Sequence, residues 1–307
     1  MNLAPLIRWL LILFATGPGM LLPAHACSLQ PGLSEEIPYL ILPRAKASSW
    51  EQESYYHGLL HLILTRTEKE FGPCRIDQTD EVLTRLRSAV LIDRQQGVDL
   101  LWGTATIERE KMLRSIPIPL LKGLMKHKIL LIHPDDQEKF SAIHNAEQLQ
   151  QLRAGLGSDW PDVTVLRNSD IPVVTSSNYE ALYKMLAARR FDFLPRGANQ
   201  ILSEVRHNAD MHILVEKDLV LIYPAPVYFY VSHDNEALAR RIETGLRSMI
   251  ADGTFDKYFY KHPMVIEVME SLNLKGRRPI YLHNPLLPEG ADPEEDDQWL
   301  SDEVKAH

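Results

Sequence analysis

Short apolar runs alternate with segments of helical periodicity along most of the chain. In the first third, apolar runs at 37–43 and 98–102 enclose two segments, 55–63 and 82–92, in which apolar residues recur every three or four positions. Residues 74–77 form a weaker strand candidate between them. Strands separated by helices of this length are typical of βαβ units and a largely parallel sheet.

A second alternating set begins with a strongly apolar strand at 129–132. It is predicted to contain three helices and four further strands. The helices are 137–152, 179–189 and 199–206, and the strands are 154–157, 173–175, 191–194 and 219–223. After Pro224-Ala225-Pro226, a strand at 227–231 leads into a long amphipathic helix that contains residues 238–250.

The two alternating sets predict an α/β fold of two lobes, each a mostly parallel sheet flanked by helices. The first lobe comprises 33–121 and 225–275, and the second lobe, 122–224, is inserted into it. The chain crosses between the lobes near 120–123 and near Pro224. A cleft between lobes is a common ligand site, and two crossing strands form a natural hinge.

The first 26 residues have the pattern of a secretory signal peptide. Arg8 provides a basic start, 9–22 is apolar, and Ala24-His25-Ala26 is a small-x-small cleavage site. The apolar run is shorter and more interrupted than the roughly 20 residues that span a bilayer. We therefore expect export to the periplasm, with cleavage after Ala26.

The other end of the chain is rich in proline and acidic residues. We expect residues 276–307 to form a solvated C-terminal tail, with Trp299 as an anchor. The formal net charge of the whole chain is −8 at pH 7, which argues against a nucleic-acid partner. It does not argue against an anionic ligand, because distant charges are screened beyond about 10 Å.

The chain has two cysteines, Cys27 and Cys74, and two interpretations remain open for them. In an oxidising compartment they are a candidate disulfide. Alternatively, Cys27 carries a lipid as the first mature residue, which would leave Cys74 free. Against lipidation, Ala24 stands where a lipoprotein signal usually has leucine.

The most distinctive chemistry follows the apolar run at 98–102. A turn with two hydroxyls, Thr104 and Thr106, precedes Arg109, so hydroxyls and a guanidinium are presented at the end of a strand, where α/β proteins bind anions. Each candidate has a plainer interpretation. Arg109 could pair with a neighbouring glutamate on the surface, and the hydroxyls could bond to the backbone of their own turn.

No signature of catalysis or of metal binding accompanies this turn. His57 and His61 are four positions apart on a predicted helix, a spacing compatible with a metal, but no further ligand is evident nearby. The sequence after residue 26 has no H-E-x-x-H, no P-loop and no G-x-S-x-G motif. We expect no metal, no cofactor and no enzymatic activity.

Three stretches resemble the periplasmic solute-binding proteins of family 3, the polar amino-acid binders with the type-2 fold. The first is Gly97-Val98-Asp99 followed by Thr104-Ala105-Thr106-Ile107-Glu108-Arg109 and 116–119, similar to the family's G-x-x-D strand and T-x-T-x-x-R turn. The second is Asn178-Tyr179-Glu180-Ala181-Leu182 with Arg190-Phe191-Asp192, and the third is 252–258, DGTFDKY. The resemblance covers roughly residues 35–262.

The resemblance implies a non-catalytic protein that closes over a small solute and presents both lobes to a membrane transporter or sensor. It implies that Arg109 holds a ligand carboxylate, with Thr104 and Thr106 as hydroxyl donors. It also places Ser158, Asp159 and Trp160 where family members set backbone amides against that carboxylate, with Trp160 stacked on the ligand. The plainer interpretation of 158–160 is an ordinary turn, with Trp160 filling the core.

Two departures from the family pattern affect the ligand. The segment between Asp99 and Thr104 is about two residues shorter, so we expect Trp102 to face the cleft. Where the amino-acid binders carry an acidic residue after Asp192, this chain has Arg196. A cleft with Arg109 and Arg196 would repel an ammonium group, so we expect a small anionic, carboxylate-bearing solute rather than an ordinary amino acid.

Two alternatives belong to other functional classes. One is an enzyme on the same scaffold, similar to cyclohexadienyl dehydratase, with Glu180 or Asp159 as the acid or base. The other is a module whose degenerate cleft no longer binds a solute and which docks on an envelope protein. The shortened cleft motif and the acidic tail favour this second alternative. In each case we expect a monomer.

Overall fold

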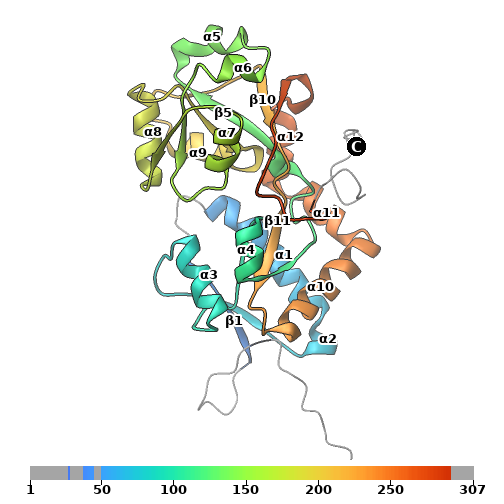
Figure 1. The fold of residues 1–307 in the computed structure, drawn as a ribbon. Coiled ribbons are helices and arrows are strands. Elements are labelled where there is room, and N and C mark those ends of the chain that lie inside the picture. Colours follow the sequence, from blue (N-terminus) through green and yellow to red (C-terminus); the bar gives the residue numbers. More distant parts are fainter. Residues whose placement is uncertain (1–26, 28–36, 45–49, 292–307) are drawn as a thin grey trace, which may run out of the picture.

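The chain folds into two α/β lobes that lie one above the other (Figure 1), as the alternating pattern predicts. The computed structural model describes Cys27, residues 37–44 and residues 50–291. The predicted signal peptide and the predicted tail beyond residue 291 lie outside the described residues. Within them, no helix combines the length and the apolar character needed to cross a membrane.

Lobe I has two small sheets. Strands β1 (Tyr39–Leu42) and β2 (Arg75–Gln78) are parallel, as expected for a βαβ unit. The other sheet has the order β3-β11-β4, and β11 is antiparallel to both neighbours. Its strands are β3 (Leu100–Thr104), β4 (Arg114–Ile116) and β11 (Val227–Val231). The sheet differs from the predicted parallel one because β11 enters it from the other lobe, in the opposite direction.

Helices enclose both sheets of lobe I. They are α1 (Trp50–Arg66), α2 (Glu68–Phe71), α3 (Arg85–Asp93), α4 (Ile107–Met112), α10 (Glu236–Ala251) and α11 (Thr254–Lys261). The apolar stripes of α1 and α10 pack together under β3 and β11, which confirms the two long helices that the periodicity predicts.

Lobe II is built on one mixed sheet of order β12-β10-β5-β8-β6-β7, with β9 (Leu214–Val215) beside β5. The strands are β5 (His127–Ile132), β6 (Ala154–Gly157), β7 (Val173–Ser176), β8 (Phe193–Gly197), β10 (Leu219–Ile222) and β12 (Arg278–Tyr281). The helices are α5 (Gln137–Ser141), α6 (Ala146–Leu149), α7 (Asp162–Asn168), α8 (Tyr179–Ala187) and α9 (Ala198–His207).

The single helix predicted over 137–152 is wrong, because two short helices, α5 and α6, occupy this stretch. The side chain of Asn145 accepts a hydrogen bond from the amide of Gln148 and so caps the start of α6. An N-cap residue has non-helical backbone angles, so a capping asparagine interrupts a helix that the apolar pattern alone would continue.

The prediction of a solvated tail from residue 276 is wrong for the first part of this segment, which forms a strand of the lobe II sheet. Strand β12 pairs in parallel with β10, and alternation buries Ile280 and Leu282 while Tyr281 stays exposed. Arg277, just before this strand, is buried and donates to the carbonyl oxygens of Leu272, Glu216 and Leu219. The edge of the lobe II sheet is therefore completed by β12, a segment predicted to be solvated.

After β12 the chain returns to lobe I, where it passes close to α4 (Figure 1). The carbonyl oxygen of Leu286 accepts a hydrogen bond from the amide of Ile107, at the start of α4. The buried Asn284 donates to the carbonyl oxygen of Pro224, at the crossing between the lobes. We call residues 282–291 the C-terminal strap; it connects the two lobes in addition to the two predicted crossings.

One apolar core extends from lobe I into lobe II. Helix α12 (Pro263–Ser271) packs against both α1 and α9, and its buried Val265 and Val268 share a core with Ile201 of α9. At the surface of this junction, Arg206 of α9 pairs with Glu51 of α1 and Glu267 of α12. The lobes are therefore joined by packing along α1, α9 and α12, and not only through crossing strands.

Cys27 and Cys74 form a disulfide in the structure. Beside it, Arg241 of α10 is fully buried and donates to Thr67 Oγ1, to the carbonyl oxygens of Leu64 and Gly72, and to Cys27 Sγ. The disulfide thus ties Cys27 to the segment between α2 and β2, and the hydrogen bonds of Arg241 connect it to α1 and α10. A cysteine in a disulfide has no thiol for a lipid, so this bond and lipidation of Cys27 exclude each other.

We predict that Cys74→Ala lowers the free energy of unfolding by about 4 kcal/mol, because the bond constrains residues that are 47 apart in sequence. Urea unfolding of the two proteins, with and without reductant, measures the difference, and reductant should lower only the stability of the unsubstituted protein. A thiol at Cys74 that reacts with maleimide in the folded, exported protein would show that the disulfide is absent and would favour lipidation.

Candidate functional site

The strands that lead to the candidate residues end at the crossing between the lobes. In lobe I, Thr104 at the end of β3 pairs with Val227, the first residue of β11. In lobe II, Gly197 at the end of β8 pairs with Lys128, the second residue of β5. Strand β6 is parallel to β8, so its last residue, Gly157, lies at the same edge of the sheet. Carboxyl ends of strands are where open α/β sheets bind ligands.

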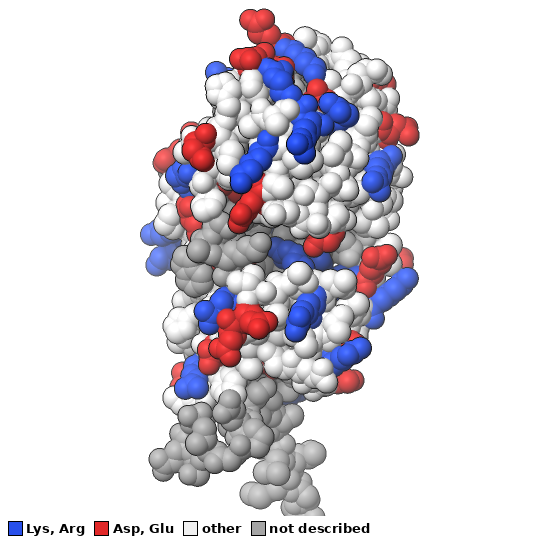
Figure 2. Space-filling model, turned by 90° about the vertical axis from the view of Figure 1, so that its left-hand side faces the viewer, with Lys and Arg blue, Asp and Glu red and all other residues white. Residues whose placement is uncertain are grey.

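We call the surface between these strand ends the waist. It comprises Thr104–Arg109 of lobe I and Ser158–Trp160 with Arg196 of lobe II. Figure 2 shows that the molecule narrows between the lobes and that basic side chains are present in this hollow. The predicted groups thus lie on both sides of one crossing, but no hydrogen bond or ion pair of the described residues joins the lobe I group to the lobe II group.

Arg109 is a half-buried residue in the first turn of α4. Its guanidinium donates to the carbonyl oxygen of Thr104, lies 5.6 Å from the centre of the Tyr230 ring, and covers Gly103, where a Cβ would stand 3.0 Å from Arg109 Nη1. Burial lowers the pKa of Arg109, yet an arginine remains charged at any physiological pH. Arg109 makes no ion pair with a carboxylate of the described residues.

The two threonines contribute to this turn in different ways. Thr106 is the N-cap of α4, and its Oγ1 accepts a hydrogen bond of 3.1 Å from the amide of Arg109. That is the plainer interpretation of the hydroxyl-rich turn, because capping uses an acceptor site of the hydroxyl. Thr104 offers its carbonyl oxygen to Arg109, and its side chain is half-buried at the waist.

Trp102 does not face the waist, contrary to the prediction. It is 7% exposed, stacks on Tyr56 with 4.9 Å between ring centroids, and meets His57 and Phe229 edge-on. Side chains alternate between the faces of a strand, and the face of β3 that carries Trp102 is covered by α1. The indole therefore belongs to the core of lobe I.

Glu53, in the first turn of α1, is a charged residue at this core that sequence reasoning missed. Burial raises the pKa of its carboxyl, while the nearby Arg85 and a hydrogen bond with Trp102 act in the opposite direction. Arg85 in turn donates to the carbonyl oxygen of Trp102 at 3.1 Å. The position of Glu53 on an amphipathic helix gave no sign that its carboxyl would be partly buried.

The turn after β6 is exposed at Ser158 and Asp159. The amide of Ser158 donates to the carbonyl oxygen of Ser176 on β7, so it is not free to bind a ligand carboxylate. Trp160 lies against Gly157, where a Cβ would stand 2.4 Å from the indole Nε1. Glu180, like Asp159, lies on the surface rather than in an enclosed site.

Arg196 is not a free cation in the cleft, contrary to the prediction. It is 7% exposed and forms a bidentate ion pair with Glu204 of α9, with both N–O distances at 2.6 Å. Its guanidinium also lies 4.1 Å from the centre of the Trp160 ring. Burial alone would lower the pKa of Arg196, but Glu204 outweighs burial and raises it well above its ordinary value.

A second buried ion pair lies nearby in lobe II. Lys128 Nζ is 2.9 Å from Asp162 Oδ1, and the Tyr223 hydroxyl donates to the same carboxylate. Burial alone would raise the pKa of Asp162, but Lys128 and Tyr223 outweigh it and lower that pKa. The only signal in the sequence is a lysine inside an apolar strand. The two buried carboxylates at this end of lobe II, Asp162 and Glu204, are therefore engaged by internal partners, whereas Asp159 is exposed.

The two histidines with metal-compatible spacing do not form a metal site with other residues. His57 contacts Trp102 and lies 3.2 Å from the side-chain amide of Gln78, whereas His61 is exposed. Over 37–44 and 50–291, no group of three or more histidine, cysteine, aspartate or glutamate side chains is arranged to hold a metal ion.

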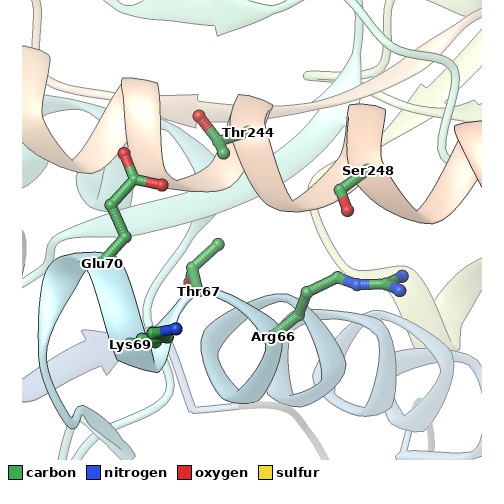
Figure 3. Close-up of a pocket in the computed structure, with 6 residues that line it drawn as sticks. All are labelled: Arg66, Thr67, Lys69, Glu70, Thr244 and Ser248. Atoms are coloured by element: carbon green, nitrogen blue, oxygen red, sulfur yellow. The ribbon is translucent and has the colours of Figure 1, made fainter.

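A pocket of about 410 Å³ lies on lobe I, remote from the waist, between α10 and the α1–α2 turn (Figure 3). Its lining residues are Arg66, Thr67, Lys69, Glu70, Thr244 and Ser248. Figure 3 shows the charged ends of Arg66 and Glu70 at opposite sides of the pocket, and Arg66 pairs with Asp252. This mixed and dispersed lining does not define a ligand site.

No protein-family model and no curated protein sequence matches this chain. Among solved structures, it resembles an ancestral arginine-binding protein bound to arginine, with a TM-score of 0.52, 17% identity, and coverage of 68% of this chain and 87% of that one. A Salmonella typhimurium periplasmic binding protein with high arginine specificity gives a TM-score of 0.51 and 15% identity, covering 68% and 88%. A mutant of ArgBP from T. maritima gives 0.52 and 15%, covering 73% and 94%.

These likenesses confirm the predicted architecture. The chain has the two-lobe type-2 fold found in periplasmic binding proteins. At identities of 15–17% they establish the fold and not the ligand.

We predict that Glu204→Ala lowers the free energy of unfolding by about 3–5 kcal/mol, because it leaves the buried Arg196 without its counter-ion. The double variant Arg196→Met/Glu204→Met should lose less than the sum of its single variants, since no unpaired charge remains. Urea unfolding of the single and double variants measures the coupling between the two residues.

As a control, the exposed pair of Arg206 and Glu51 should contribute no more than about 1 kcal/mol to the free energy of unfolding. If the free-energy changes of the Arg196 and Glu204 single variants add up to that of the double variant, the two residues do not form a stabilising buried ion pair.

We predict that Glu53→Gln flattens the pH dependence of stability. The pKa of Glu53 is raised in the folded protein above its ordinary value of 4.5, so the folded state holds the proton more tightly and loses stability as the pH rises through this window. The variant should therefore have a higher urea midpoint than the unsubstituted protein at pH 7 and a similar one below pH 4.5. The exposed Glu147→Gln serves as the control, and parallel pH profiles would refute the prediction.

Proposed function

We propose that this protein is an exported, non-catalytic binding protein that holds a small carboxylate-bearing solute at the waist and presents it to a membrane transporter or sensor. The fold supports the proposal, because the three solved structures reported above are named as arginine-binding or periplasmic binding proteins. Export rests on the signal-peptide pattern of residues 1–26.

One observation carries the proposal: Arg109 is half-buried at a strand end and lacks a carboxylate partner in the described part of the chain. A guanidinium has five N–H donors, and the bond to the Thr104 carbonyl uses one of them. The remaining donors suit a carboxylate, which arginine binds through two parallel hydrogen bonds. A bound solute would supply the carboxylate partner that Arg109 lacks among the described residues.

The chemistry of lobe II changes the expected ligand. Arg196 no longer argues against an ammonium group, since Glu204 neutralises it. Amino acids therefore belong among the candidate solutes, and proteins of this fold are named as binding arginine. Glu204 and Asp162 are both paired internally, so neither is free to hold a positive group of the solute. We infer that the carboxylate is the group that this protein recognises.

The C-terminal strap favours a second candidate function, a docking module without a solute. The strap bonds to Ile107 at the start of α4, directly beside Thr106 and close to Arg109. The strap is therefore fixed next to the turn that carries the proposed anion-binding residue. The experiment below distinguishes the two functions, because a docking module would respond to no small molecule.

We predict that a carboxylate-bearing compound raises the Tm of the mature protein by a few degrees. A ligand that binds only the folded state stabilises it by about 2.7 kcal/mol at a hundredfold excess over its Kd. The screen uses amino acids, dicarboxylates and other small anions, with thermal unfolding as the readout. Arg109→Met should abolish the shift while keeping the apolar packing, and Arg87→Met, an exposed arginine on α3, should preserve it.

A shift that persists in Arg109→Met would place the ligand elsewhere. No shift with any compound would reject solute binding and favour the docking module.

A further inference from the structure

The guanidinium of Arg196 occupies an enclosed site formed by a carboxylate and two aromatic rings. Glu204 presents both carboxylate oxygens to it in the geometry of a fork, each at 2.6 Å. Trp160 offers its ring face at 4.1 Å, and the ring centre of Tyr179 lies at 5.8 Å. We call Glu204, Trp160 and Tyr179 the guanidinium cage.

The cage walls come from elements other than the strand that carries Arg196. Trp160 follows β6 and is held against Gly157, to whose carbonyl oxygen its amide donates at 3.1 Å. Tyr179 begins α8 and accepts a hydrogen bond from the hydroxyl of Tyr183 at 2.7 Å. Glu204 belongs to α9, which packs on β5 and β8. Each wall therefore has its own support and does not depend on the Arg196 side chain for its position.

The negative charge of the buried Glu204 carboxylate requires a positively charged partner in the cage. The Glu204 side chain is 3% exposed, and a carboxylate buried to this degree is costly unless it is paired. A planar guanidinium satisfies both oxygens and the ring face at the same time, whereas an ammonium is a compact point charge without a fork. The geometry therefore distinguishes two cations of equal charge.

We propose that Arg196 is the internal occupant of this guanidinium cage and thereby a specificity-determining residue. By filling the cage at the carboxyl end of β8, it prevents Glu204 from accepting a cationic group of a solute. Its role in specificity rests on the function proposed above, whereas the cage itself does not. Without the Arg196 side chain, the cage is a binding site for a free guanidinium compound.

The experiment is chemical rescue of Arg196→Ala. Truncation should destabilise the protein, because Glu204 stays buried without a partner. Millimolar methylguanidinium should raise the Tm of this variant by roughly 2 °C or more, and methylammonium, which has the same charge, should not. The unsubstituted protein and Arg153→Ala, which truncates an exposed arginine of the same lobe, should respond to neither compound.

A further variant tests the role of the carboxylate. Arg196→Ala/Glu204→Gln should lose the response to methylguanidinium, since the cage no longer carries a charge. A response that survives in the double variant, an equal response to methylammonium, or a response no larger than that of Arg153→Ala would each overturn the proposal.

If Arg196→Ala does not fold in buffer, its refolding yield becomes the readout. Recovery of folded protein only with methylguanidinium supports the cage, and no recovery while Arg196→Lys folds overturns it. These measurements involve neither Arg109 nor a carboxylate solute. Failure of the cage is therefore distinguishable from failure of the proposed function.

Discussion

The packing of α9 against α1 and α12 is the contact on which the arrangement of both lobes depends. Ala198, Ile201, Val265 and Val268 are buried there in a single core. Burial of one large apolar side chain is worth about 1.5–3 kcal/mol, whereas the exposed ion pairs of Arg206 in the same place are worth about 0–1 kcal/mol each. Apolar packing therefore dominates this junction. The strap adds a polar contact between the lobes at the start of α4.

A second constraint, the cost of burying charge, determines what remains available at the waist. Lys128 with Asp162 and Arg196 with Glu204 are buried at the end of lobe II that faces the crossing, and each charge has a partner. An unpaired charge in these positions would cost several kcal/mol, so the local sequence provides the partner. These four side chains therefore stabilise one another in the interior of lobe II, and none of them is left to pair with a ligand.

The periodicity of apolar residues predicted most elements, because burial on one face depends on local spacing. Strands β6 and β11 have the predicted bounds, and β5 differs by two residues at its start. The spacing of apolar residues does not show which distant strands pair with each other. Strand β12 lies next to β10 although nearly sixty residues separate them, and its arginine-proline composition resembles a tail. Likewise, the sequence shows Arg196 and Glu204 but gives no indication that they pair. Their side chains meet because the chain turns from β8 directly into α9.

Arg109 and Arg196 show why a motif predicts a fold more securely than a binding site. Both arginines stand near the ends of strands at the crossing, and sequence reasoning assigned both to the ligand. The two arginines differ in their partners among the described residues: Arg196 pairs with a buried carboxylate, whereas Arg109 contacts a carbonyl oxygen and a tyrosine ring. A paired charge attracts a solute weakly, and a half-buried charge without a counter-ion attracts an anion strongly. The capacity of the waist to bind an anion therefore depends on lobe I, and lobe II limits which other groups the solute can carry.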